Sequence, residues 1–241
     1  MSTVNFYEDS LRAATYESVG AAGTYAIAFR ELVPILEPLR PARALDFGCG
    51  VGRSSRFLKN LGFDVVGVDI ASEMVARARK ADPGGDYRLL LGGDALGSFE
   101  TASFALVLVA WAFDNVHESA EKRRALGDLR RLLDDNGTLI LIASTPELYT
   151  NEWASFTTSD YPRNLAATSG DLVKICIKGT RDERPYEDTF FTDADYRHLF
   201  DDARFTVRAV HRPLGLPDEP CEWVSEETTA PWVIYELSKS G

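Results

Sequence analysis

Three glycines at alternate positions follow the first apolar strand pattern of the chain. Residues 45–52 read Leu-Asp-Phe-Gly-Cys-Gly-Val-Gly, which places Gly48, Gly50 and Gly52 where a predicted strand passes into a predicted helix. Glycines let the backbone turn sharply there, and they keep side chains from covering the main chain. A ligand can then lie against backbone amides. The segment therefore predicts a loop that binds a nucleotide cofactor.

Two acids accompany this loop. The apolar run 63–69 predicts a second strand and ends in Asp69, whose carboxylate can accept hydrogen bonds from both hydroxyls of a ribose. The dinucleotide fingerprint requires a third glycine where this chain has Arg53, which disfavours the alternative of an NAD-dependent oxidoreductase. Asp46 stands two residues before the first glycine, where a carboxylate suits a zwitterionic ligand better than a pyrophosphate.

The Asp-x-Gly-x-Gly-x-Gly pattern of residues 46–52 resembles the first motif of the class I S-adenosylmethionine-dependent methyltransferases. The motifs that carry this resemblance lie in roughly residues 43–141. Outside that range, the stretches 153–156, 192–196 and 230–235 resemble a bacterial branch of the family that acts on small molecules. It implies S-adenosylmethionine as the cofactor and S-adenosylhomocysteine as the product.

The same resemblance implies contacts after each of four successive strands. Asp69 would bind the ribose, Ile70 and Met74 would pack on the adenine, and Asp94 would accept from its amino group. The remaining implied contacts are Ala95 beside the adenine, and Ala110 and Trp111 along the methionine part.

Each acid also has a purely structural alternative. Asp46 and Asp69 could cap the helices that follow them, and Asp94 could belong to a turn with its two preceding glycines. These alternatives do not explain why all three acids fall after strands, at the edge where open α/β sheets bind their ligands.

The chain as a whole alternates strand and helix patterns, which predicts an α/β fold. We expect one Rossmann-like, doubly wound domain over residues 1–241, with a seven-stranded sheet, helices on both faces and an antiparallel last strand. An N-terminal helical cap would span 1–41 and the cofactor-binding half 42–144. A substrate-side insertion would span 145–191, with the last helix and strands at 192–241.

Three side chains are candidates for catalysis. Methyl transfer from a sulfonium is an in-line displacement with a neutral leaving group, so the protein mainly has to align the reactants and exclude water. An amine or hydroxyl acceptor would also need a base. Asp114 and His117 follow the fourth predicted strand, and Tyr16 lies in the N-terminal cap. For His117 the alternative is a helix cap or a packed side chain.

The composition limits the classes of partner that we expect the protein to bind. The net charge of −11 leaves little to attract nucleic acid. No apolar run approaches the ~20 residues of a membrane span, and no signal peptide is recognisable, so we expect a cytoplasmic protein without a membrane partner. Three scattered histidines and three distant cysteines predict no metal site.

The insertion mixes aromatic and acidic side chains, among them Tyr149, Trp153, Phe156, Glu187 and Asp188. This mixture suits a partly apolar or cationic small molecule as methyl acceptor. The sequence leaves open whether nitrogen, oxygen or carbon receives the methyl group, and it leaves the oligomeric state open. A non-catalytic protein that binds the cofactor as a partner subunit also stays open, because fold does not fix function.

Overall fold

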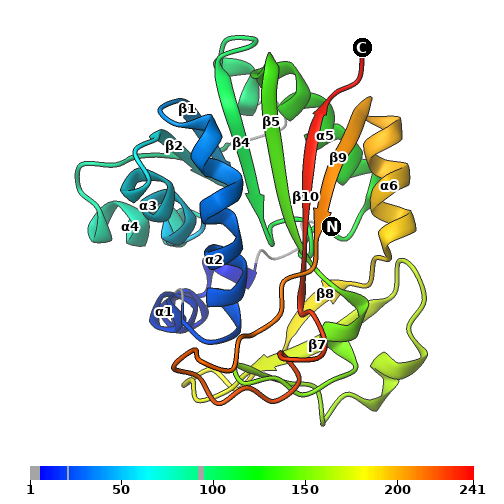
Figure 1. Ribbon diagram of the computed structural model, residues 1–241. Coiled ribbons are helices and arrows are strands. Elements are labelled where there is room, and N and C mark those ends of the chain that lie inside the picture. The colour runs from blue at the N-terminus through cyan, green and yellow to red at the C-terminus, as the bar shows by residue number, and fades with distance from the viewer. Residues whose placement is uncertain (1–5, 21, 92–94) are drawn as a thin grey trace.

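A seven-stranded sheet forms the centre of the computed structural model, which describes residues 6–20, 22–91 and 95–241 (Figure 1). The strand order is β3-β2-β1-β4-β5-β10-β9. Strands β1 to β5 pair in parallel, whereas β10 is antiparallel to both of its neighbours. The strands are β1 (Arg43–Phe47), β2 (Asp64–Asp69), β3 (Asp86–Leu89), β4 (Phe104–Ala110), β5 (Leu133–Ser144), β9 (Phe205–His211) and β10 (Trp232–Lys239). The predicted Rossmann-like fold with an antiparallel last strand is confirmed.

Helices cover both faces of this sheet because its central strands are apolar on both sides. In β4, Leu106 and Leu108 face a core shared with α2 (Thr24–Leu36) and α3 (Arg53–Asn60). The alternate residues Val107 and Val109 face a second core. That core is shared with α5 (Ser119–Leu132) and α6 (Asp193–Asp202). A further helix, α4 (Ser72–Ala81), packs on β2 and β3.

The N-terminal region consists of a short 3₁₀ turn, η1 (Phe6–Glu8), and two helices, α1 (Ser10–Val19) and α2. The break between the helices contains Gly20 and Gly23, whose φ angles of 60° and 58° end a right-handed helix. Within the described residues, no single helix combines the length and the apolar character needed to cross a membrane. Only α1 together with residues 24–39 passes that test of length and composition, as a pair bent by 61°.

The insertion adds a small second sheet in the order β6-β7-β8, formed by β6 (Phe156–Thr157), β7 (Leu172–Ile177) and β8 (Tyr186–Thr189). Figure 1 shows β7 and β8 beyond the carboxyl ends of β4 and β5. Sequence analysis assigned no strands here, although Val173, Ile175 and Ile177 alternate with more exposed residues as a half-buried strand should. Short 3₁₀ turns complete the connections: η2 (Glu37–Leu39), η3 (Ala95–Ser98), η4 (Pro146–Tyr149) and η5 (Pro162–Ala166).

Candidate active site

The glycine loop joins β1 to α3 at the carboxyl edge of the sheet. Gly48, Gly50 and Gly52 have φ angles of 73°, 53° and 77°, a region that residues with side chains rarely adopt. A Cβ atom on Gly48 would also lie 2.4 Å from the Cβ of Ala112. Both the turn and the close approach therefore require glycine at this position.

We expect Gly48→Ala to lower the free energy of unfolding by about 1–3 kcal/mol, because the side chain strains the backbone and meets Ala112. Gly127→Ala is the matched control. Gly127 lies within α5, where an added Cβ meets nothing within 4 Å, so alanine should stabilise the protein by about 0.5–1 kcal/mol. Urea unfolding of both variants measures the difference. Equal effects would mean that the loop tolerates a side chain.

Asp46 is fully buried beneath this loop. Its Oδ2 accepts hydrogen bonds from the hydroxyls of Ser54 at 2.7 Å and Ser55 at 2.5 Å, both in the first turn of α3. Its Oδ1 has no partner among the described residues. Burial raises the pKa of Asp46 to about 6. Asp46 therefore does not cap α3, whose N-cap is Gly52. Its Oδ2 binds two serine side chains of that helix, and its Oδ1 fits a ligand that donates a hydrogen bond.

Asp69, at the end of β2, connects the glycine loop that follows β1 to the segment that follows β2. Its Oδ2 accepts from the backbone N–H of Gly50 and its Oδ1 from that of Ala71, both at 2.8 Å. Burial raises the pKa of this carboxyl. Each carboxylate oxygen has two acceptor sites, so both can still receive a ribose hydroxyl. The helix α4 starts only after this residue, with Ala71 at its N-cap.

The residues implied for the adenine lie in different surroundings. Ile70, which directly follows β2, is 65% exposed. Met74 is buried on α4 in a small cluster with Ala13 and Val51, so it lies directly beneath α1. Asp94 lies outside the described residues, and Ala95 begins η3 without a described side chain.

Trp111 follows Ala110 at the end of β4 and has a strained backbone. Its φ of 57° lies in the left-handed region, which is rare for so bulky a residue, and its N–H donates to the carbonyl of Ile142 at 2.9 Å. Backbone strain of this kind gathers at functional sites. The indole Nε1 is buried and has no hydrogen-bond partner among the described residues.

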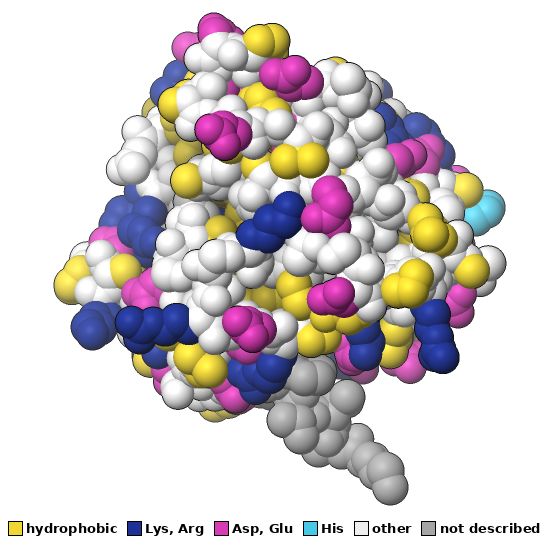
Figure 2. Space-filling model, turned by 90° about the horizontal axis from the view of Figure 1, so that it is seen from below, with side chains coloured by type: hydrophobic (Ala, Val, Ile, Leu, Met, Phe, Trp, Pro, Cys, Tyr) yellow, Lys and Arg dark blue, Asp and Glu magenta, His cyan; other side chains and the backbone are white. Residues whose placement is uncertain are grey.

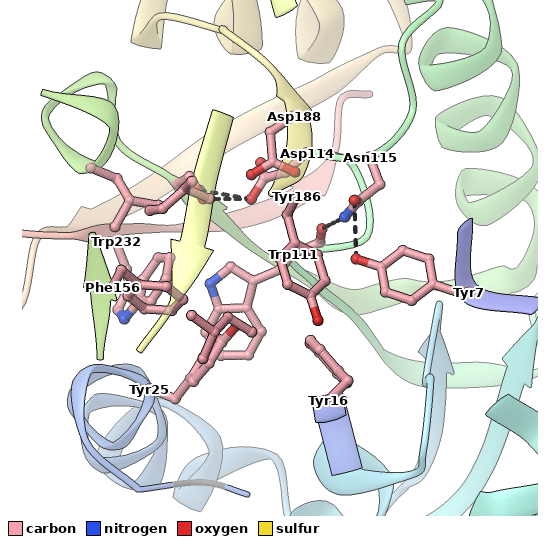
Figure 3. A pocket seen from close by; sticks show the side chains of 14 residues that line it. Tyr7, Tyr16, Tyr25, Trp111, Asp114, Asn115, Phe156, Tyr186, Asp188 and Trp232 are labelled. Carbon is pink, nitrogen blue, oxygen red and sulfur yellow. Dashed lines mark hydrogen bonds between the residues drawn. The ribbon is translucent and has the colours of Figure 1, made fainter. Parts of the chain in front are cut away.

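A small cavity that opens to solvent lies beside Trp111. Figure 3 shows it between the N-terminal helices, the end of β4 and the insertion (Figure 3). Tyr16 links the cavity to the cofactor loop, because its ring lies 3.8 Å from the position of a side chain on Gly50. Much of the wall is aromatic and includes Tyr7, Tyr16, Tyr25, Trp111, Tyr186 and Trp232.

Comparison with known proteins matches residues 45–141 to the methyltransferase domain family. This is the part of the chain that carries the glycine loop, Asp69 and the end of β4. Residues 45–141 are thus similar to the same kind of protein that the sequence motifs resemble. The Asp46 oxygen without a partner among the described residues, the glycine loop and the Asp69 carboxylate fit S-adenosylmethionine as a cofactor.

Two curated relatives are similar over part of their length. The chain is 33% identical over 109 residues to 2-methyl-6-phytyl-1,4-hydroquinone methyltransferase of Synechocystis sp., covering 44% of this chain and 33% of the relative. It is 30% identical over 174 residues to 23S rRNA (uracil(1939)-C(5))-methyltransferase RlmD of Thiobacillus denitrificans, covering 70% of this chain and 35% of the relative. The chain therefore spans about a third of the length of both.

The fold is similar to that of a putative S-adenosylmethionine dependent methyltransferase from Listeria monocytogenes. The TM-score is 0.62 at 17% identity, and the match covers 90% of this chain and 99% of the other. The likeness in fold thus extends beyond residues 45–141 of the chain.

Arg53 lies beside the glycine loop, and the sequence marked it only as a missing glycine. Its guanidinium donates to the Gly20 carbonyl at 2.5 Å and to the Tyr16 hydroxyl at 3.0 Å. It also lies 4.1 Å from the ring centre of Tyr25 and 5.1 Å from that of Trp111. Arg53 thereby fixes the two N-terminal tyrosines beside the glycine loop through hydrogen bonding and cation–π contact.

The structure brings two of the three catalytic candidates to the cavity. Tyr16 and Asp114 both line it. His117 is exposed instead, and its Nδ1 lies 3.1 Å from the hydroxyl oxygen of Thr189. The turn that follows Trp111 directs Asp114 inward and leaves His117 at the surface, away from the cavity.

A second carboxyl, Asp188 of β8, lines the cavity next to Asp114. Burial, together with the nearby Asp114, raises the pKa of Asp188 to about 7. Burial also raises the pKa of Asp114. Lys122 is buried in contact with the ring of Phe191, and burial lowers its pKa to about 8. The cavity thus contains two carboxyls whose pKa values are raised by burial, and the pKa of Asp188 lies near neutrality.

The raised pKa of Asp188 predicts how the free energy of unfolding changes with pH. Because the folded pKa of Asp188 lies above the unfolded value of about 4, the folded state keeps a proton that the unfolded chain releases. The stabilisation that comes from this retained proton is complete below pH 4 and is lost as the pH rises to about 7. Across this range the free energy of unfolding falls by up to about 1.4 kcal/mol per pH unit. Asp188→Asn should flatten the fall in unfolding free energy across this window, measured by urea unfolding at several pH values. An unchanged slope would contradict the assignment, and Glu187→Gln is the neighbouring control.

Proposed function

We propose that the chain transfers the methyl group of S-adenosylmethionine to a small-molecule acceptor held in the aromatic cavity. The observation that carries this proposal is the position of Tyr16, which borders both the glycine loop and the cavity. A ligand in the cavity would lie next to a cofactor on the loop. Such proximity is the main requirement for an in-line displacement.

The residues proposed to hold the cofactor lie along the carboxyl edge of β1, β2 and β4. Asp69 would bind the ribose, Ile70 would cover the adenine, and the Asp46 oxygen without a partner would receive a donor from the methionine part. The bound cofactor supplies an electrophilic methyl group. The aromatic wall would exclude water, which keeps the nucleophile desolvated and prevents hydrolysis.

The surface around the cavity supports a small acceptor over a nucleic acid. One relative is named for a hydroquinone and the other for 23S rRNA, so both kinds of acceptor need consideration. Figure 2 views the molecule from the side of the insertion, where Lys and Arg side chains are interspersed with Asp and Glu (Figure 2). Binding to a phosphate backbone relies on clustered basic side chains, and the net charge here is −11.

Transfer of a labelled methyl group tests this proposal. The chain would be incubated with methyl-labelled S-adenosylmethionine and either a small-molecule extract or total RNA, and the products would be separated by size. We expect label in the small-molecule fraction only. Label in RNA would replace the proposal with an RNA methyltransferase, and label in neither fraction, despite cofactor binding, would favour a non-catalytic partner protein.

A further inference from the structure

The inner end of the cavity is acidic as well as aromatic. Asp114 and Asp188 line it, and its lining contains no Lys, Arg or His side chain among the described residues. Carboxylates attract cations because they supply full negative charge, and the rings of Tyr25 and Tyr186 already make cation–π contacts to Arg53 and Arg12. The two acids differ in how many hydrogen bonds their carboxylate oxygens already accept from the protein.

Asp114 is fully engaged by the protein. Its Oδ2 accepts from the backbone N–H of Ser144 at 3.1 Å and from the hydroxyl of the same residue at 2.7 Å. Its Oδ1 accepts from the Tyr196 hydroxyl at 3.2 Å. These donors fix the carboxylate against β5 and α6. Asp114 is therefore a positioning residue that holds the end of β4 and adds negative charge to the cavity.

Asp188 is free to bind a ligand. It is 7% exposed, and its Oδ2 accepts from the Tyr149 hydroxyl at 3.0 Å. None of the hydrogen bonds between described residues ends on its Oδ1, and the side chain belongs to the cavity wall. Asp188 thus presents one available acceptor in the wall of the aromatic cavity, which opens to solvent.

The hydroxyl of Tyr186 is an independent indication of a ligand. Tyr186 is 6% exposed and lines the same cavity, yet its hydroxyl has no partner within the described parts of the chain. Figure 3 shows this hydroxyl pointing toward Tyr16, at the side of the cavity that borders the glycine loop. A buried hydroxyl without a partner is costly, so a ligand that hydrogen-bonds to it gains affinity.

We infer that the methyl acceptor is an amine, with its nitrogen bound by Asp188 Oδ1 and its substituents enclosed by the rings of Tyr25, Tyr186 and Trp232. This inference rests on the proposed function and narrows its acceptor class. Neither a carboxylate acceptor nor a phosphate fits, because each would bring a further negative charge to Asp114 and Asp188.

Methyl transfer to an amine requires one group in the cavity that accepts a proton. Asp188 Oδ1 takes a proton from the ammonium form of the acceptor, which frees the nitrogen lone pair. That pair forms the new nitrogen–carbon bond while the carbon–sulfur bond breaks and its electrons pass to sulfur. The positive charge moves from sulfur to nitrogen next to the Asp188 carboxyl, which returns its proton to water after the product leaves.

The test compares three probes of similar size and different charge: benzylamine, benzyl alcohol and benzoate. Each would be titrated calorimetrically into the full chain saturated with S-adenosylhomocysteine. We expect benzylamine to bind at least tenfold more tightly than benzyl alcohol, and benzoate to bind least. Asp188→Asn should lower benzylamine affinity at least tenfold and leave the affinity for benzyl alcohol unchanged.

Glu187→Gln provides the control, because Glu187 is the preceding residue of β8 and pairs with Lys174 at 3.0 Å outside the cavity lining. It should leave all three affinities unchanged. Wild-type protein without a preference for benzylamine would overturn the inference, whether or not Asp188→Asn folds. The same holds for an Asp188→Asn variant that keeps the preference. Failure of S-adenosylhomocysteine itself to bind would remove the proposed function instead, so the two failures are distinguishable.

Discussion

Asp69→Ala is expected to weaken binding of S-adenosylhomocysteine by about 100-fold. The carboxylate already links Gly50 and Ala71, and each of its oxygens can still accept one ribose hydroxyl. Hydrogen bonds to a charged group contribute about 1.5–3 kcal/mol each, and about 1.4 kcal/mol corresponds to a tenfold change in affinity. Calorimetric titration of the variant measures the loss.

The matched control for this experiment is Asp64→Ala. Asp64 begins the same strand, its side chain is 81% exposed, and its contact with Arg43 is long at 3.9 Å. It should bind S-adenosylhomocysteine as the wild type does. Wild-type affinity in Asp69→Ala would remove Asp69 from the site, whereas equal losses in both variants would point to a general effect of charge.

Asp182→Asn is expected to lower the free energy of unfolding by about 3 kcal/mol. Asp182 accepts from Arg12 of α1 at 3.2 Å and from Arg184 at 2.7 Å, and the side chains of Arg12 and Asp182 are almost fully buried. Removing one partner of a buried ion pair costs about 3–5 kcal/mol. Because this pair joins α1 to the insertion over the cavity, cofactor affinity should fall as well.

The comparison variant is Asp202→Asn, which breaks the pair between Asp202 and Arg123 with the same change of side chain. Both side chains of that pair are about half exposed. Exposed pairs contribute about 0–1 kcal/mol, so little change is expected in urea unfolding. A loss for Asp182→Asn as small as for Asp202→Asn would show that α1 is held mainly by apolar contacts.

The cofactor half of the fold was predictable because local patterns determine it. Continuous apolar runs such as Phe104–Val109 specify buried parallel strands, and the glycine loop permits only one kind of strand-to-helix turn. The order of these elements then brings Gly50 and Asp69 together across two neighbouring strands.

The cavity was less predictable because distant segments build it. Tyr7 and Tyr25 precede the first strand, Asp188 follows the fifth, and Trp232 begins the last. In the sequence, each of these residues on its own is typical of an ordinary buried or exposed side chain. Only the tertiary fold brings them together around one cavity. The contacts of Arg53 were not predicted for the same reason, since its aromatic partners come from α1, α2 and the turn after β4.

The most direct test of the account is calorimetric titration of the purified chain with S-adenosylmethionine, S-adenosylhomocysteine and NAD in parallel. The account predicts micromolar binding of the first two and none of NAD, because Arg53 occupies the position of the third glycine that a pyrophosphate requires. Binding of NAD alone would contradict it and make a dehydrogenase the working hypothesis.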